Sequence, residues 1–141
     1  MLDQIIEHLE VSAYQIPTDF PESDGTLEWN STTLVLVEAG AGDARGLGYT
    51  YCSQSCAALI SEKLFPLIHN RPLLESQSHW NSMVSSIRNL GRPGIASCAI
   101  AAVDIALWDL KARLLELPLV QLLGQVRQTV PVYGSGGFTS Y

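Results

Sequence analysis

The sequence predicts an α+β fold in which a three-stranded antiparallel sheet is followed by a bundle of helices. Residues 5–16 and 32–51 have the alternating or β-branched patterns of strands, and residues 55–117 place apolar side chains at helical spacing. Clusters of glycine and proline separate these segments. The length of 141 residues and the 47% hydrophobic composition suit one globular domain with a substantial core.

The first strand is expected over residues 5–16, because its side chains alternate in character. One side carries Ile5, Leu9, Val11 and Ala13, and the other carries Ile6, His8, Glu10, Ser12 and Tyr14. Pro17 is expected to end this strand and to begin a long loop over residues 17–31. Long loops in compact domains are often lids, and the apolar Phe20, Leu27 and Trp29 favour a lid that docks on the protein.

A hairpin is expected next. Residues 32–39 are rich in β-branched side chains, residues 40–43 read Gly-Ala-Gly-Asp, and residues 45–51 form a further short run. With the first strand this gives a three-stranded antiparallel sheet. Such a sheet needs a layer packed on one face to be stable, and the helices supply it.

Three helices follow. The first, over residues 55–68, is expected to end or kink at Pro66. The second covers residues 73–90, with one stripe formed by Trp80, Met83, Val84, Ile87 and Leu90. The third has the clearest period, ends at Pro118 and contains an Asp109–Arg113 pair; its stripe is Ile100, Val103, Leu107, Leu110, Leu114 and Leu117. One more strand is expected over residues 129–133, without a partner strand.

Charge and hydropathy exclude several function classes. Residues 1–50 hold nine acids and one base (−8), and residues 51–141 hold five acids and seven bases (+2), which together give the net charge of −6. Because no run of lysine or arginine offers a surface for phosphates, a nucleic-acid partner is not expected. The apolar stretch 95–108 is too short to cross a membrane. Three cysteines and a start without a secretory signal predict a cytoplasmic protein.

The polar motifs do not form an active site by themselves. Cys52 and Cys56 lack the further ligands of a zinc site, and the acidic run 19–25 does not match a calcium loop. Asp104 and Asp109 lie about 140° apart around a helix, so they cannot converge on one ion. The three histidines fall in three different elements, and the glycines at 134–137 lack the residues of a phosphate loop.

The amino-acid sequence of the third helix and of the segments beside it points to a family. Residues 101–112 read AAVDIALWDLKA, preceded by GRPG at 91–94 and followed by LPL at 117–119, LLG at 122–124 and VPVY at 130–133. The whole chain resembles the mandelate racemase and muconate lactonising enzyme family of the enolase superfamily.

The resemblance implies a capping domain over residues 1–126 and the first strand of a (β/α) barrel over residues 127–141. In the family, a divalent ion, usually Mg²⁺, stabilises the enediolate formed when a proton is removed next to a substrate carboxylate. Three carboxylates on later barrel strands bind the ion, and lysine or histidine bases on other barrel strands move the proton. None of those positions exists in this sequence, so no catalytic or metal-binding residue is expected here and this chain alone is expected to be inactive.

The resemblance also implies which residues of this chain contact the substrate. The family's specificity loops correspond to residues 17–31 and 50–53, which makes Phe20, Trp29 and Tyr51 the expected pocket residues. Ser135 falls where a serine of the racemase branch touches substrate, although an ordinary turn serine is the alternative. The implied parent is a Mg²⁺-dependent racemase or dehydratase of a hydroxy acid or acid sugar, with cycloisomerase and dipeptide epimerase left open.

Two other hypotheses remain from the sequence. One alternative to the capping part of an enzyme is a standalone, non-catalytic binding domain, and the other is the remnant of a truncated gene. A homo-oligomer is expected for the parent. Because apolar surface intended for the barrel would be exposed, the chain alone is expected to associate and its last strand to be unpaired.

Overall fold

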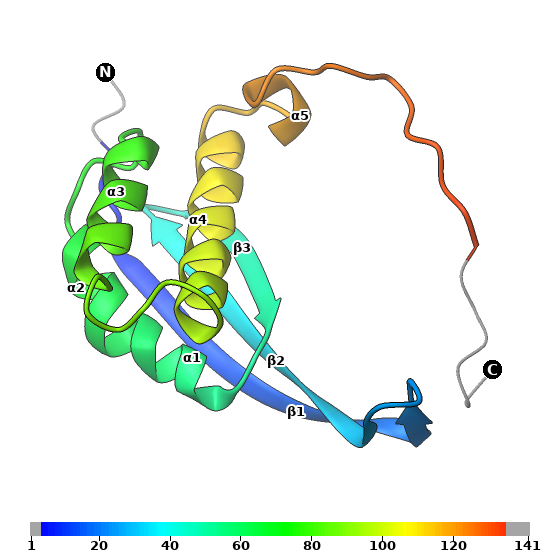
Figure 1. Cartoon of the computed structure of the whole chain (residues 1–141). Coiled ribbons are helices and arrows are strands. Elements are labelled where there is room, and N and C mark those ends of the chain that lie inside the picture. Colours follow the sequence, from blue (N-terminus) through cyan, green and yellow to red (C-terminus); the bar gives the residue numbers. More distant parts are fainter. Residues whose placement is uncertain (1–3, 135–141) are drawn as a thin grey trace.

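The computed structural model describes residues 4–134 and has the predicted α+β architecture. Strands β1 (His8–Ser23), β2 (Glu28–Ala41) and β3 (Ala44–Tyr51) form an antiparallel sheet in the order β1-β2-β3. Helices α1 (Gln54–Leu59) and α4 (Ile95–Leu114) pack on one side of this sheet, and α3 (Ser76–Ser86) packs against α4 (Figure 1). The predicted hairpin at 40–43 is confirmed, since Ala41 pairs with Ala44 across it.

The core lies between the sheet and the helices. Its sheet side comes from Val35, Val37 and Ala39, which are fully buried, and from the half-buried Leu9, Val11 and Ala13. This confirms the predicted alternation from Leu9 onward. Ile5 and Ile6 depart from it, because they precede β1: Ile6 is fully buried and Ile5 is exposed.

The segment 17–31 is not the loop that the sequence predicts. β1 continues through Pro17 to Ser23 and β2 begins at Glu28, so the two strands form a long hairpin with a shift of register between Pro17 and Glu22. An edge strand tolerates proline, because the missing N–H can lie on the side without a neighbouring strand. β1 is such an edge. Prolines therefore did not end the strand here.

The first helical segment does not end at Pro66, but its geometry changes just before that residue. A five-residue π-helix, η1 (Ile60–Leu64), joins α1 to the short helix α2 (Phe65–Ile68), and the N–H of Phe65 donates to the carbonyl of Ile60. This wide turn places Pro66 in the first turn of α2, where a proline costs no helical hydrogen bond. One buried stripe runs along the whole segment: Cys56, Ile60, Leu64 and Ile68.

Helix α4 lies on β3 at very short range. A Cβ atom added to Gly46 would lie 2.6 Å from Cα of Leu110, and one added to Gly48 would lie 2.7 Å from the backbone N of Ala106. Both would be closer still to other backbone atoms of α4. The helix contributes small residues at this contact, since Ala102 and Ala106 are fully buried. Glycine on the strand and alanine on the helix therefore let the two backbones touch.

Asp109 joins the same helix to the outer edge of the sheet. Its Oδ2 accepts hydrogen bonds from the backbone N–H of Leu47 in β3 and from Nε of Arg113, both at 2.8 Å. The predicted Asp109–Arg113 pair is thus confirmed. The further bond to Leu47 spans 62 positions of sequence and could not be inferred from helical spacing.

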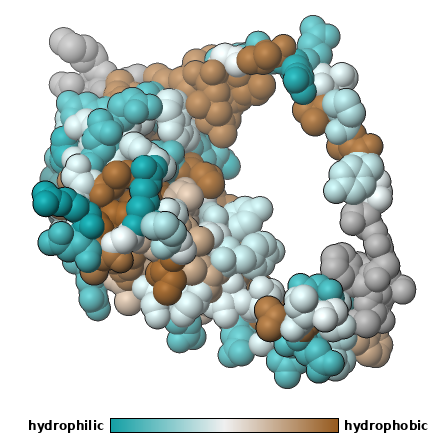
Figure 2. Space-filling model, viewed as in Figure 1, coloured by the Kyte–Doolittle hydropathy of each residue, from teal (hydrophilic) through white to brown (hydrophobic). Residues whose placement is uncertain are grey.

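The chain leaves this body through α5 (Leu119–Leu122), which lies beyond the end of α4 (Figure 1). Apolar side chains gather there (Figure 2), and Leu117, Val120 and Leu123 are all exposed. Residues 129–133, expected as a strand, form none, because no strand among residues 4–134 pairs with them. Val130, Val132 and Tyr133 are more than two-thirds exposed.

Candidate functional site

The part of the hairpin formed by residues 17–31, which we call the hairpin arm, extends past the helical layer (Figure 1). Phe20 and Trp29 both lie on it, and Trp29 pairs with Glu22 across the two strands. Phe20 is 62% exposed and Leu27 is 69% exposed, so the arm does not dock on the described part of this chain. Strand pairing holds the arm away from the helices of this chain, and docking of the arm as a lid stays a prediction.

Trp29 is half-buried and lines a shallow groove of about 250 Å³. The other lining residues are Pro21, Glu28 and Asn30. The sequence did not single out Pro21 or Asn30, because the shift of register in the arm breaks the alternation that would place them beside Trp29.

The tip of the arm is a turn held by one carboxylate. Oδ1 of Asp24 accepts hydrogen bonds from the N–H of Thr26 (2.9 Å), the hydroxyl of Thr26 (2.6 Å) and the N–H of Leu27 (3.0 Å). These donors, first the Thr26 hydroxyl, lower the pKa of Asp24 to about 2. Its carboxylate stays ionised and holds the turn at the tip of the arm.

Tyr51 lies apart from this groove. It ends β3, pairs with Leu34, is 64% exposed and makes an edge-to-face contact with Tyr49 at 6.2 Å between ring centroids. Five positions of β2 separate Leu34 from Trp29, which is roughly 17 Å of strand. The structure thus brings Phe20 and Trp29 onto one arm but does not join Tyr51 to them. Ser135 lies outside the described residues.

Three free thiols come from separate elements. Cys52 follows β3, Cys56 lies in α1 and Cys98 lies in α4. Burial raises the pKa of Cys52, and it raises that of Cys56 to about 12, so these groups stay protonated. Within residues 4–134 no three His, Cys, Asp or Glu side chains are placed to hold a metal ion. The described residues therefore do not fit the Mg²⁺ site of the family.

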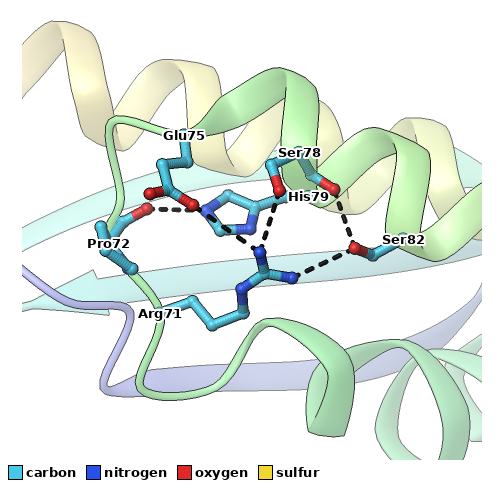
Figure 3. A network of polar contacts seen from close by, with 6 residues as sticks. All are labelled: Arg71, Pro72, Glu75, Ser78, His79 and Ser82. Carbon is cyan, nitrogen blue, oxygen red and sulfur yellow. Dashed lines mark hydrogen bonds and ion pairs between the residues drawn. The ribbon is translucent and has the colours of Figure 1, made fainter.

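The most connected polar cluster surrounds His79 at the start of α3 (Figure 3). Arg71 donates to the hydroxyls of Ser78 (2.9 Å) and Ser82 (3.1 Å) and lies 3.6 Å from Glu75. His79 is fully buried, and its Nε2 lies 2.7 Å from the carbonyl oxygen of Pro72. A carbonyl can only accept, so Nε2 carries the hydrogen and Nδ1 is bare. The cluster ties the start of α3 to the turn before it.

The buried His79 should make the fold sensitive to acid. Burial lowers the pKa of His79, against a smaller opposing effect of the Pro72 carbonyl. Since the unfolded chain then binds the proton more readily, stability should fall as pH drops below about 6.5, by at most about 1.4 kcal/mol per pH unit. Replacing His79 with glutamine, which keeps a donor, should flatten this dependence. Denaturant unfolding between pH 7.5 and 5.5 measures it.

The matched control is His69→Gln, because His69 is exposed and directly follows α2. That variant should keep the slope of the parent chain. Equal slopes for the parent chain and His79→Gln would contradict a role for His79.

In the described part of the chain, no helix has the length and apolar character needed to cross a membrane.

Comparison with known proteins identifies the domain. The family model described as "Mandelate racemase / muconate lactonizing enzyme, N-terminal domain" matches residues 11–124. The 3,6-anhydro-alpha-L-galactonate cycloisomerase of Streptomyces coelicolor is 34% identical over 140 residues, which cover 94% of this chain and 38% of that protein.

Solved structures show the same fold. A mandelate racemase/muconate lactonizing enzyme-like protein from Rubrobacter xylanophilus superposes with a TM-score of 0.91 at 55% identity, over 97% of this chain and 38% of that one. L-Talarate dehydratase from Polaromonas sp. JS666, complexed with Mg and L-glucarate, gives 0.77 at 25% identity, over 90% and 37%.

The chain thus spans little more than a third of the length of these relatives. Within that span the match to the family model takes in the sheet from Val11, every described helix and Gly124 after α5. The chain belongs to the mandelate racemase / muconate lactonizing enzyme family and carries its N-terminal domain.

Proposed function

We propose that this chain is the substrate-capping part of a Mg²⁺-dependent enzyme that removes a proton next to the carboxylate of a hydroxy acid or acid sugar. Residues 1–126 are the proposed cap, and residues 127–141 lead into the barrel. The observation that carries the proposal is the hairpin arm, which presents Phe20 and Trp29 away from the helices in a chain of this family. Racemisation and dehydration are the proposed reactions, with cycloisomerisation as the alternative.

The chemistry of the arm suggests which part of a substrate it covers. Residues 17–31 contain four acidic side chains and no basic one. A carboxylate would be repelled by this charge, whereas hydroxyl groups and carbon-bound hydrogens would not. Phe20 and Trp29 are therefore proposed to close over the carbon chain and exclude water, and Tyr51 and Ser135 to contact the substrate from other segments. The substrate carboxylate is assigned to the rest of the enzyme.

No catalytic residue is assigned to this chain. The described residues lack a set of three His, Cys, Asp or Glu side chains that could hold Mg²⁺, and burial favours the uncharged forms of His79, Cys52 and Cys56. The proposal therefore places the metal and the bases in the barrel, and it expects the 141-residue chain alone to show no proton abstraction.

A chimera tests the proposal. Residues 1–126 would replace the corresponding domain of the Streptomyces coelicolor cycloisomerase, and exchange of the proton next to the carboxylate would be followed by NMR in D₂O with a panel of acid sugars. We expect exchange by the chimera. Phe20→Ala and Trp29→Ala should each lower kcat/KM by about tenfold, mainly through KM, because they remove contacts made to bound substrate. Leu90→Ala is the control, because Leu90 is exposed and lies after α3, outside the hairpin arm.

Loss of activity in a correctly folded chimera, or equal activity of the two arm variants and the control, would contradict the capping role. Binding of an acid sugar by the 141-residue chain alone, unaffected by Mg²⁺ and removed by the arm variants, would favour a standalone binding domain instead.

A further inference from the structure

The contact between β3 and α4 continues past the two glycines toward a pair of thiols. A Cβ atom added to Gly46 would meet Ala106, and one added to Gly48 would meet Ala102. Two residues of a strand advance about 6.7 Å and four residues of a helix about 6 Å, so the two elements stay nearly in step while they run in opposite directions. The next position on this stripe of α4, four residues before Ala102, is Cys98.

The strand side of the same contact ends at Cys52, which follows β3 and lies four positions after Gly48. The N–H of Cys52 donates to the carbonyl of Thr33 in β2 at 3.1 Å, and this bond keeps the backbone in line with the strand. In the first turn of α4, the N–H of Cys98 donates to the carbonyl of Gly94 at 3.1 Å. The end of β3 and the start of α4 lie at the same end of the domain (Figure 1), and both cysteines pack against the core.

The two thiols adjoin and are partly accessible. Burial is the largest cause of the raised pKa of Cys52, and smaller contributions come from the negative charge that Cys98 can carry and from a side-chain hydrogen bond with it. Such a bond requires two sulfur atoms that lie next to each other. Both cysteines are half-buried, whereas Cys56, which also adjoins Cys52, is fully buried. A small oxidant therefore reaches Cys52 and Cys98 more readily than Cys56.

We propose that Cys52 and Cys98 are a site of oxidative modification, at which a hydroperoxide converts the two thiols into a disulfide that joins the end of β3 to the first turn of α4. The bond would fix the segment that directly follows Tyr51. The inference does not depend on the proposed capping function, because it concerns only the contact between a strand and a helix of this chain.

The oxidation proceeds in two steps. The thiolate of one cysteine attacks an oxygen of the hydroperoxide, the O–O bond breaks, and this sulfur becomes a sulfenic acid. The second thiol loses its proton and attacks that sulfur, so that the S–S bond forms, the S–O bond breaks and the oxygen leaves as water. With hydrogen peroxide, two thiols and one peroxide molecule give one disulfide and two water molecules; the sulfurs are oxidised and the peroxide is reduced.

The backbone around the two thiols suits this bond. A disulfide needs Cα atoms about 4.4 to 6.8 Å apart, and the glycine contacts already hold the backbones of β3 and α4 at short range. The raised pKa of Cys52 makes its thiolate scarce at neutral pH, so the oxidation is expected to be slow. Once formed, the bond restricts the unfolded chain between positions 52 and 98 and stabilises the fold.

Peptide mapping of the 141-residue chain after treatment with hydrogen peroxide tests the proposal. With the remaining thiols blocked by iodoacetamide, trypsin releases residues 46–63, which carry Cys52 and Cys56, and residues 89–111, which carry Cys98. We expect these two peptides to be joined by a bond that dithiothreitol breaks, with one alkylated cysteine left in 46–63. The Tm of the oxidised chain should be about 5 to 10 °C above that of the reduced chain.

Two alanine variants identify the pair. Cys56→Ala should keep the link and the rise in Tm, and Cys52→Ala should lose both; circular dichroism of the reduced proteins verifies that each is folded. A bond within residues 46–63 would overturn the proposal, because Cys56 would then be the partner of Cys52. Three thiols that all stay open to alkylation after peroxide, a bond between two chains, or a link that persists in Cys52→Ala would overturn it equally.

Discussion

Gly48→Ala should abolish the native packing of α4 on the sheet and cost about 3 kcal/mol or more. The added methyl group would lie 2.7 Å from the backbone N of Ala106 and closer to the carbonyl oxygen of Ala102. Backbone atoms of a 20-residue helix cannot rotate away as a side chain would. The whole helix would have to move off β3, and the buried side chains around it would lose their contacts. Urea unfolding followed by circular dichroism measures the loss.

Gly134→Ala is the matched control, because nothing lies within 4 Å of the position at which its Cβ would be placed. It should unfold at the urea concentration of the parent chain. If Gly48→Ala also did so, α4 would not approach β3 as the structure describes. Gly46→Ala gives a second test of the same contact, since its methyl group would meet Leu110.

Leu107→Ala should destabilise the chain by about 3 kcal/mol, because the side chain is fully buried in the core. The change removes apolar contacts and leaves a cavity that the surrounding elements fill only in part. Ile105→Ala on the same helix is the control. Ile105 is 47% exposed, so its truncation should change the free energy of unfolding by less than about 1 kcal/mol.

These two variants lie two positions apart and have similar effects on helix propensity. Their difference in unfolding free energy therefore reports which side of α4 faces the core. Similar losses in both would mean that the helix is rotated relative to the structure.

The sequence predicted α4 well because its apolar stripe persists over several turns, and such a period identifies both the helix and its buried side. It predicted the 32–51 hairpin from β-branched residues and a glycine turn. It did not predict the close contact at Gly46 and Gly48, since a glycine in a strand does not reveal which helix will approach it. The buried His79 was equally hidden, because its single hydrogen-bond acceptor is a carbonyl of a separate turn.

The candidate site, like the fold, was predicted only in part from the sequence. Phe20 and Trp29 were predicted as pocket residues, and both lie on the hairpin arm, although their contact with substrate stays a prediction. The form of the arm was missed, because Pro17 was expected to end the first strand, while β1 is an edge strand that can accommodate it. Tyr51 was grouped with them from the resemblance alone, and only the register shows how far along the sheet it lies.

The hydrogen bond from Leu47 to Asp109 also bears on how this protein avoids misassembly. β3 is an edge strand, and a free backbone N–H on such an edge can template a strand from another molecule. The carboxylate of Asp109 accepts the hydrogen bond from the N–H of Leu47, and it places a charged group where an incoming strand would have to lie. Addition of a strand at this position of β3 would therefore first require the hydrogen bond between Leu47 and Asp109 to break.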